Sequence, residues 1–150
     1  MITVKQIPPE LTYDIRHIVL RAGLPRESCF WETDRDAFHL GGWLGVRQVG
    51  VATFQPEADP DAPDRPAYRL RGMAVLPDAQ GQGVGALMLL SGEDRVRRLG
   101  VFQLWCDARI GAAAFYRRYG WEAYGGVYTI PTAGEHYRMK KTLGKTAVCG

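Results

Sequence analysis

A glycine-rich segment between a strand-like run and a helix-like run constrains the fold of this chain most. The strand-like run extends from Tyr68 to Leu76 and the helix-like run from Val84 to Leu99, with Gly81, Gly83 and Gly85 at alternate positions. Without side chains in the way, the N–H groups of such a turn and of the following helix start can converge on one anion, usually a phosphate. The segment therefore predicts a strand–turn–helix unit that either cradles a phosphate or simply makes a tight turn.

The spacing of these glycines excludes two common nucleotide-binding motifs. A Walker P-loop needs Gly-Lys-Ser/Thr, whereas Gly85 is followed by Ala86 and Leu87. A Rossmann fingerprint needs G-x-G-x-x-G, whereas the glycines here read G-x-G-x-G. What remains is Gln80-x-x-Gly83-x-Gly85, a pyrophosphate loop of another kind.

Three segments, taken together, resemble the GNAT superfamily of N-acetyltransferases. Gln80 to Ala86 resembles the Q/R-x-x-G-x-G/A motif that binds acetyl-CoA in that family. Leu70 to Pro77 looks like its central strand, and Ala112 to Trp121 looks like its A-x-x-F-Y-x-x-x-G-F segment, with tryptophan in the last place. The segments follow the family's order and spacing, so the resemblance covers residues 68 to 143, while the first 67 residues match more loosely.

The resemblance implies the GNAT fold, an α/β (α+β) architecture. In that fold about six or seven strands form a mixed, mostly antiparallel central sheet with helices on both faces and a parallel pair splayed at the centre. The length of 150 residues agrees with a single domain, 1–150, whose last residues, 145–150, we expect to form a flexible tail. The apolar periodicity predicts helices at 10–22, 84–99 and 112–119, the last with Gly120 as its C-cap, and strands at 37–46, 49–55, 68–76, 101–106, 121–130 and 137–143.

The strand at 68–76 changes phase at Gly72. Its apolar positions are Tyr68 and Leu70 before the glycine, and Met73 and Val75 after it. An extra residue in the ladder, a β-bulge, would produce this switch, and so would a strand buried on both faces beyond Gly72. The GNAT resemblance favours the bulge, which in that family pushes this strand away from its parallel neighbour.

Charge, apolar runs and cysteine spacing argue against nucleic acid, membranes and metals as partners. The net charge is only +3 and the chain has no long block of Lys and Arg, so nothing predicts nucleic-acid binding. No run approaches 18 apolar residues and the N-terminus lacks a signal-peptide pattern, so we expect neither a membrane span nor secretion. The cysteines Cys29, Cys106 and Cys149 lack metal-ligand spacing, which favours a reducing cytoplasm and no metal.

The resemblance assigns the binding of acetyl-CoA to two backbone segments. N–H groups of Gln82 to Ala86 would bind the pyrophosphate, and the strand from Met73 to Val75 would hold the pantetheine arm and polarise the acetyl carbonyl. The predicted cofactor-binding residues are Met73, Ala74, Val75, Gln80, Gly81, Gln82, Gly83, Val84, Gly85 and Ala86.

Tyr116 is the predicted catalytic residue. It matches the GNAT tyrosine whose phenol donates a proton or a hydrogen bond to the sulfur of CoA as the thiolate leaves. Read by periodicity alone, Tyr116 is a core residue on a helical face that it shares with Phe115 and Tyr119. Cys106 lies in an apolar strand with no histidine near it in sequence, so we do not expect it to be an acyl-enzyme nucleophile.

The acceptor side of the site stays open. The cluster Glu32, Asp34, Asp36 and His39 is either an amine pocket or a solvated acidic loop, and no general base can be chosen among its members and Glu122 and His136. Trp31 and Trp43 either line the acceptor site or fill the core. Arg109 stands where many family members have asparagine, and it either contacts a CoA phosphate or is solvated.

The resemblance implies an enzyme that moves an acetyl group from acetyl-CoA to a primary amine by direct attack in a ternary complex. Small-molecule and peptide amines both fit as the acceptor, and since family members are often dimers, a homodimer fits as well. Two rival functions share the fold: a non-catalytic acyl-CoA-binding or regulatory domain, and the transfer of a longer acyl group.

Overall fold

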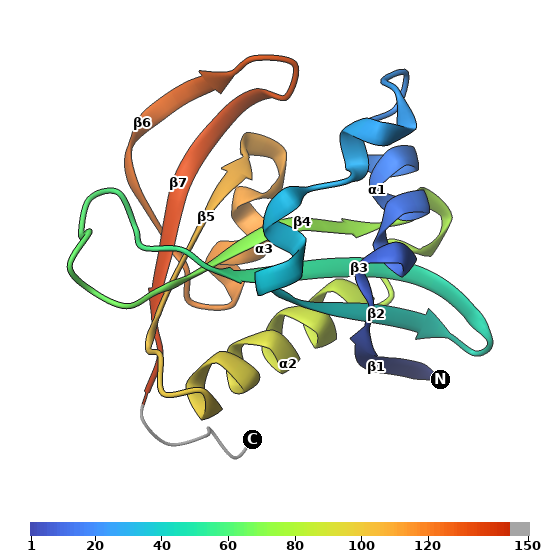
Figure 1. Ribbon diagram of the computed structural model, residues 1–150, viewed down its shortest axis with the longest axis horizontal. Coiled ribbons are helices and arrows are strands. Elements are labelled where there is room, and N and C mark those ends of the chain that lie inside the picture. Colours follow the sequence, from blue (N-terminus) through green and yellow to red (C-terminus); the bar gives the residue numbers. More distant parts are fainter. Residues whose placement is uncertain (145–150) are drawn as a thin grey trace. The chain divides into compact units, whose positions relative to one another are not determined.

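The computed structural model describes residues 1–144, so the predicted tail at 145–150 lies outside the described residues. Its strands form one mixed sheet in the order β1-β2-β3-β4-β5-β7-β6 (Figure 1). The β4–β5 pair is parallel, and the pairs β1–β2, β2–β3, β5–β7 and β6–β7 are antiparallel. The predicted α/β fold with a mostly antiparallel sheet is therefore confirmed. The elements are β1 (Ile2–Ile7), α1 (Tyr13–Val19), β2 (Phe38–Leu44), β3 (Arg47–Pro56), β4 (Tyr68–Val75), α2 (Val84–Arg98), β5 (Gln103–Arg109), α3 (Ala113–Arg118), β6 (Glu122–Ile130) and β7 (Gly134–Thr142).

The chain divides into two compact units. The first unit comprises Met1–Pro56 and Leu70–Arg95, and the second comprises Glu57–Arg69 and the described part of Val96–Gly150. Strand β4 and helix α2 each begin in one unit and end in the other. The single-domain organisation of residues 1–150 stays a prediction.

In the first unit, α1 and α2 pack on opposite faces of the sheet. Ile15 of α1 packs with Val51 of β3. The neighbouring residue of β3, Gly50, faces the side chains of Val84 and Met88 in α2. Because successive residues of a strand point to opposite faces, the two helices cover opposite sides. This arrangement confirms the prediction of helices on both faces.

Helix α2 lies close to the sheet because of a glycine in the helix itself. A Cβ atom placed on Gly92 would lie 2.0 Å from Cζ of Phe54, a distance that no real contact reaches. The ring of Phe54 is fully buried and stacks on that of Phe38, with 5.0 Å between centroids. The absence of a side chain at Gly92 therefore leaves room for the ring of Phe54 from β3. This contact explains why a glycine stands in the middle of a helix.

Gly72 in β4 has a left-handed backbone, with φ of +67°, and touches an aromatic ring. A Cβ atom at this position would lie 2.7 Å from the indole of Trp31. Left-handed glycines are common at bulges, which agrees with the change of phase in the sequence. The parallel partners in β4 and β5 are Tyr68↔Leu104 and Arg69↔Trp105. The bulge itself and the divergence of the parallel strands stay predictions.

In the second unit, α3 ends in a Schellman motif. The N–H of Trp121 donates to the carbonyl of Tyr116 at 3.1 Å, and the N–H of Gly120 donates to that of Arg117 at 3.1 Å. The rings of Tyr116 and Trp121 lie 5.4 Å apart and supply the apolar contact that accompanies this motif. Tyr119 occupies the cap position, and Gly120, with φ of +88°, follows it by one residue. The predicted cap was therefore displaced by one residue.

Three other elements differ from the prediction. The edge strand β1 was not predicted, because its short sequence alternates weakly and leads into Pro8 and Pro9. The turn between β2 and β3 lies at Gly45, with φ of +60°, and Val46 rather than at residues 47 and 48. Strand β5 starts later than predicted, at Gln103. It also ends later, because Asp107, Ala108 and Arg109 stay paired with β7 beyond the apolar run.

Candidate functional site

The glycine-rich loop forms a sharp connection between β4 and α2. Gly81 and Gly83 both adopt left-handed backbone conformations, with φ of +80° and +95°. The helix begins at Val84, and its first backbone bond runs from the N–H of Leu87 to the carbonyl of Gly83 at 3.1 Å. The N–H groups that precede Leu87 in the first turn have no partner within the helix.

Those N–H groups are the ones that the sequence predicts to bind a pyrophosphate, and this role stays a prediction. In the described part of the chain, no backbone carbonyl is recorded as the partner of an N–H group from Gln82 to Ala86. Helix α2 spans 15 residues, so its dipole adds positive potential at the same place. Backbone donors and this potential suit a pyrophosphate, and neither depends on a side chain.

The side chain of Gln80 ties this loop to the end of β4. Its amide Nε2 donates to the carbonyl of Val75 at 3.0 Å. The predicted pantetheine segment, Met73 to Val75, and the predicted pyrophosphate loop, Gln80 to Ala86, therefore belong to one unit and are held by a direct hydrogen bond. The glutamine of the motif acts as a structural link.

Tyr116 lies in α3, in the second unit, and is 7% exposed. Burial, with a smaller contribution from Cys106, raises the pKa of its phenol well above the ordinary value. The hydroxyl therefore keeps its proton throughout the physiological range. Its ring lies edge-on to that of Phe115, with 5.3 Å between centroids. Tyr116 is thus a core residue whose protonated hydroxyl suits a proton donor.

Cys106 has the environment of an inert thiol. It is 2% exposed, and burial raises the pKa of its thiol far above the ordinary value. The thiolate that a nucleophile requires is therefore absent at neutral pH.

The acidic cluster at residues 32–39 is divided between surface and core. Glu32 and Asp36 are exposed, whereas Asp34 is buried and accepts two hydrogen bonds from Arg16, at 2.7 and 2.9 Å. Arg16 is fully buried and also donates to Thr53 at 2.7 Å. The charge of Asp34 is thus matched by Arg16, so Asp34 is not an open anchor for an amine.

His39 belongs to the same buried network. Its Nε2 lies 3.0 Å from the carbonyl of Asp34, which can only accept, so Nε2 carries the proton. Its Nδ1 lies 2.8 Å from the Thr53 hydroxyl and accepts from it. Burial lowers the pKa of His39, and the nearby Arg16 acts in the same direction. His39 is therefore a neutral structural residue.

Trp31 and Trp43 have different surroundings. The guanidinium carbons of Arg16 and Arg71 lie 3.6 and 4.0 Å from the Trp31 ring centroid, and the same ring touches Gly72. Trp43 packs at the edge of the core that includes Ile15 and Val51. The network around Arg16 therefore reaches β4 at the residue just before the predicted pantetheine segment.

The remaining sequence candidates do not gather into one cluster. His136 is buried, its Nδ1 lies 2.7 Å from the Gly134 carbonyl, and its ring stacks on Tyr128. Glu122 and Arg109 are exposed. Among residues 1–144, no three His, Cys, Asp or Glu side chains lie close enough together to hold a metal ion.

Sequence reasoning missed a polar cluster in the second unit. Asp107 accepts hydrogen bonds from Arg69 at 3.0 Å, from Arg138 at 3.1 Å, and from the hydroxyl of Tyr128. Burial and the neighbouring Asp107 raise the pKa of Tyr128 to about 12. These residues lie on four different segments of the chain, so no local pattern indicates the cluster.

None of the helices within residues 1–144 combines the length and apolar character needed to cross a membrane.

Comparisons with known proteins show which family the chain resembles. The family model for the acetyltransferase (GNAT) domain matches residues 27–123. The chain is 37% identical over 145 residues to the uncharacterized N-acetyltransferase YitI of Bacillus subtilis strain 168, covering 95% of this chain and 97% of that protein.

Solved structures share the fold at lower identity. The ribosomal-protein-S18-alanine N-acetyltransferase of Escherichia coli matches with a TM-score of 0.73 and 19% identity, covering 100% of this chain and 97% of that one. A GNAT family acetyltransferase of Elizabethkingia anophelis, with acetyl-CoA bound, matches with a TM-score of 0.70 and 13% identity, covering 95% and 98%. Given the family match and the identity to a full-length relative, this chain belongs to the GNAT superfamily of N-acetyltransferases.

Proposed function

We propose that this enzyme transfers the acetyl group of acetyl-CoA to a primary amine by direct attack in a ternary complex. The observation that carries the proposal is the loop from Gln80 to Ala86, where left-handed glycines and the start of α2 present backbone N–H groups to an anion. The relative from Elizabethkingia anophelis, whose structure holds acetyl-CoA, shares the fold.

In this proposal the binding of acetyl-CoA rests on backbone groups. The N–H groups from Gln82 to Ala86 hold the pyrophosphate, and Met73 to Val75 hold the pantetheine arm. An N–H group of that strand polarises the thioester carbonyl as negative charge develops on its oxygen. The hydrogen bond from Gln80 to Val75 keeps the two segments in register with each other.

The chemical step is a single displacement. The amine nitrogen attacks the thioester carbonyl, a C–N bond forms, the C–S bond breaks, and the nitrogen loses a proton to water. We assign the role of acid to Tyr116, whose phenol gives a proton to the departing thiolate. Its support is the family motif together with the raised pKa of a buried phenol, which keeps the proton available. Asp34 and His39 are excluded as the base, because each is engaged in the buried network around Arg16.

The test is a thiol-release assay with acetyl-CoA across amino acids, polyamines, aminoglycosides and peptide N-termini. We expect thiol to appear with at least one amine class and an N-acetyl product of matching mass. Tight acetyl-CoA binding without release for any amine would instead favour the non-catalytic acyl-CoA-binding domain. Faster release from longer acyl-CoA thioesters would favour transfer of a longer group.

The cradle has its own test and a matched control. Gly83→Asp places a carboxylate among the N–H donors, so we expect acetyl-CoA affinity in calorimetry to fall by about 100-fold or more. Gly45→Asp puts the same charge on another left-handed glycine, in the turn between β2 and β3, and should leave affinity unchanged. Equal affinities in the two folded variants would disprove the cradle.

We also propose a cytoplasmic location. Cys29 and Cys106 are both buried free thiols, which suits a reducing compartment. Expression as a fluorescent fusion in a bacterial host, followed by fractionation, would locate the protein.

A further inference from the structure

The ring of Trp31 holds two positively charged side chains. The guanidinium carbon of Arg16 lies 3.6 Å from the ring centroid, and that of Arg71 lies 4.0 Å from it. Both distances are within the range of a cation–π contact. The indole N–H donates to the carbonyl of Ser28 at 3.0 Å, which fixes the position of the ring. Trp31 therefore holds one cation from α1 and one from β4.

The two cations have different surroundings. Arg16 is fully buried, and both carboxylate oxygens of Asp34 accept hydrogen bonds from it, at 2.7 and 2.9 Å. Arg71 is half-buried, and its Nη1 lies 3.4 Å from the hydroxyl of Thr33. A guanidinium has five N–H donors, so Arg71 can keep its protein partners and still present donors to a ligand. Arg71 is therefore the cation of this pair that a ligand can reach.

Gly72 brings Trp31 against the strand that we propose to hold acetyl-CoA. A Cβ atom at Gly72 would lie 2.7 Å from the indole, so the ring packs on the backbone of β4. Met73, the first residue of the proposed pantetheine segment, follows directly, and its Cα lies at most about 7 Å from that of Arg71. These residues all belong to the first unit. Arg71 therefore stands two residues from the segment where we propose that the thioester lies.

The surroundings of Trp31 favour an anion beside Arg71. Two cations on one ring repel each other, and a negative charge beside Arg71 would offset that repulsion. A planar guanidinium donates two parallel hydrogen bonds to a carboxylate, and stacking on an aromatic ring holds the guanidinium in place for them. A purely cationic acceptor, such as a polyamine or an aminoglycoside, would instead meet like charge.

We propose that Arg71, held on Trp31, binds a carboxylate of the acceptor, and that the acceptor is a small amine of the amino-acid class. The inference rests on the acetyl transfer proposed above for the fate of the amine. The carboxylate stays at Arg71 while the amine of the same molecule attacks the thioester beside Met73 to Val75. A peptide N-terminus carries an amide where an amino acid carries this carboxylate, so it fits less well.

The test compares amino acids with their decarboxylated amines in the thiol-release assay. The readout is the ratio of the two kcat/KM values, amino acid over decarboxylated amine. Arg71→Gln should lower this ratio about tenfold or more, because only the amino acid loses charged hydrogen bonds. The basicity of each amine is the same with both enzymes, so it cancels from the comparison. A merely structural role of Arg71 would lower both values together, and an unchanged ratio would overturn the proposal.

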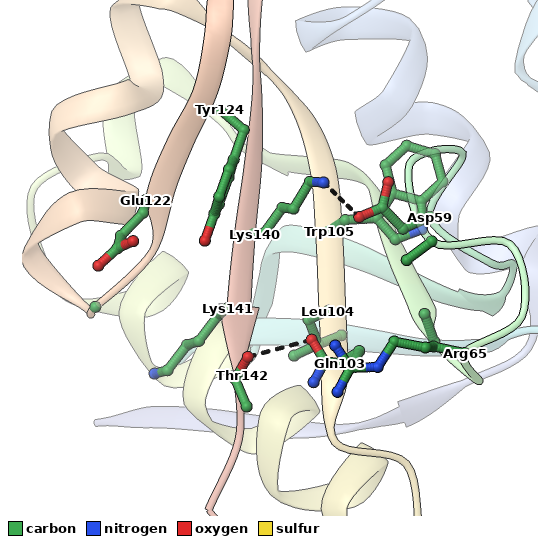
Figure 2. Close-up of a pocket in the computed structure, with 13 residues that line it drawn as sticks. Asp59, Arg65, Gln103, Leu104, Trp105, Glu122, Tyr124, Lys140, Lys141 and Thr142 are labelled. Carbon is green, nitrogen blue, oxygen red and sulfur yellow. Dashed lines mark hydrogen bonds and ion pairs between the residues drawn. The ribbon is translucent and has the colours of Figure 1, made fainter.

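Two other arginines supply controls. The guanidinium carbon of Arg95, in α2, lies 5.0 Å from the ring centroid of Phe38, so Arg95→Gln removes another stacked arginine and should leave the ratio unchanged. Figure 2 shows Arg65 beside Gln103 in a cavity of about 430 Å³ in the second unit. Arg65→Gln should also leave the ratio unchanged. A ratio lowered by Arg65→Gln in place of Arg71→Gln would move the carboxylate to that cavity and overturn the proposal.

Calorimetry separates this proposal from the acetyl transfer. Amino acids are titrated singly into the full chain in the presence of CoA, which has no acetyl group to transfer. We expect at least one to bind, and Arg71→Gln to weaken its binding about tenfold or more. If no amine releases thiol, this titration alone decides: weakened binding in Arg71→Gln supports the carboxylate site, and no binding overturns it. If amines react but the ratio is unchanged in Arg71→Gln, the acetyl transfer stands and the carboxylate site fails.

Discussion

At the scale of single residues, the hydroxyl of Tyr116 gives the sharpest prediction about catalysis. Tyr116→Phe keeps the buried ring and removes only the proton donor. We expect kcat to fall by about 100-fold, the lower end for a general acid, with the KM for acetyl-CoA changed less than about threefold. Steady-state kinetics with the best amine from the thiol-release screen would measure both.

Tyr119→Phe is the matched control for that substitution. Tyr119 ends the same helix and its ring lies 5.3 Å from that of Phe115, yet no catalytic role falls to it. We expect its kinetics to match those of the parent enzyme. An unchanged kcat in Tyr116→Phe, with chemistry rate-limiting, would remove the acid role.

His39 makes the stability of the fold depend on pH. Its pKa is lowered in the folded chain, so below about pH 6.5 the unfolded chain binds a proton that the folded chain does not. The contribution of His39 is therefore complete above that pH and is lost as the pH falls, at up to about 1.4 kcal/mol per pH unit.

Urea unfolding between pH 5 and 8 would measure this loss. His39→Gln should flatten the slope on the acid side, whereas His17→Gln, at a half-buried site on α1, should leave it in place. A slope that survives in His39→Gln would assign the effect to other groups.

Single residues also show which features can be predicted from the sequence: local motifs can, and contacts between distant residues cannot. The loop from Gln80 to Ala86 was predicted because its information is local: glycines at fixed spacing before a helix. The partnership of Arg16 with Asp34 was not, because the two residues stand 18 positions apart and meet only after α1 docks. The sequence therefore leaves Asp34 either in an amine pocket or in a solvated acidic loop, whereas the structure pairs it with Arg16 in the core.

At the scale of elements, Gly92 shows two effects of opposite sign. Alanine would favour the helical state of α2 by about 1 kcal/mol. Its Cβ would also collide with the buried ring of Phe54, and overpacking of this kind costs about 1–3 kcal/mol. We expect packing to win, so Gly92→Ala should lower the free energy of unfolding by up to about 2 kcal/mol.

Chemical denaturation of Gly92→Ala beside Gly126→Ala would test this. A Cβ atom at Gly126, in β6, would meet nothing within 4 Å, so that variant should be close to neutral. A Gly92→Ala variant more stable than the parent would show that Phe54 can move aside.

Elements with strong periodicity were the ones predicted well. Helix α2 begins where the glycine loop ends, and its apolar stripe covers its whole length. The end of strand β5 was misplaced because Asp107 interrupts the apolar run of the sequence. In the structure Arg69 and Arg138 donate hydrogen bonds to Asp107, so the strand continues past it. Residues 101 and 102 lie instead in the connection after α2, where the N–H of Val101 donates to the carbonyl of Val96 at 3.2 Å.

At the scale of the whole molecule, the two compact units share continuous elements. Because β4 and α2 pass from one unit to the other, we expect both units to unfold in one cooperative transition. Trp31 and Trp43 report on the first unit, and Trp105 and Trp121 on the second. In each variant that keeps only one of these pairs, the urea midpoint by fluorescence should therefore equal the midpoint by circular dichroism of the same variant.

Acetyl-CoA provides the control for that experiment. At about 100 times its Kd it should add about 2.7 kcal/mol to the free energy of unfolding, and both tryptophan pairs should report the same increase. Fluorescence and circular-dichroism midpoints that differ within one variant would instead mean that the units unfold independently.

The buried pairing of Arg16 with Asp34 constrains how these two positions can change during evolution. Removing either partner alone strands a charge in the core, at a cost of about 3–5 kcal/mol out of a total stability of about 5–15 kcal/mol. Selection should eliminate lineages that pass through such a half-changed intermediate. Across the descendants of a common ancestor, codons 16 and 34 should therefore be exchanged together or kept together.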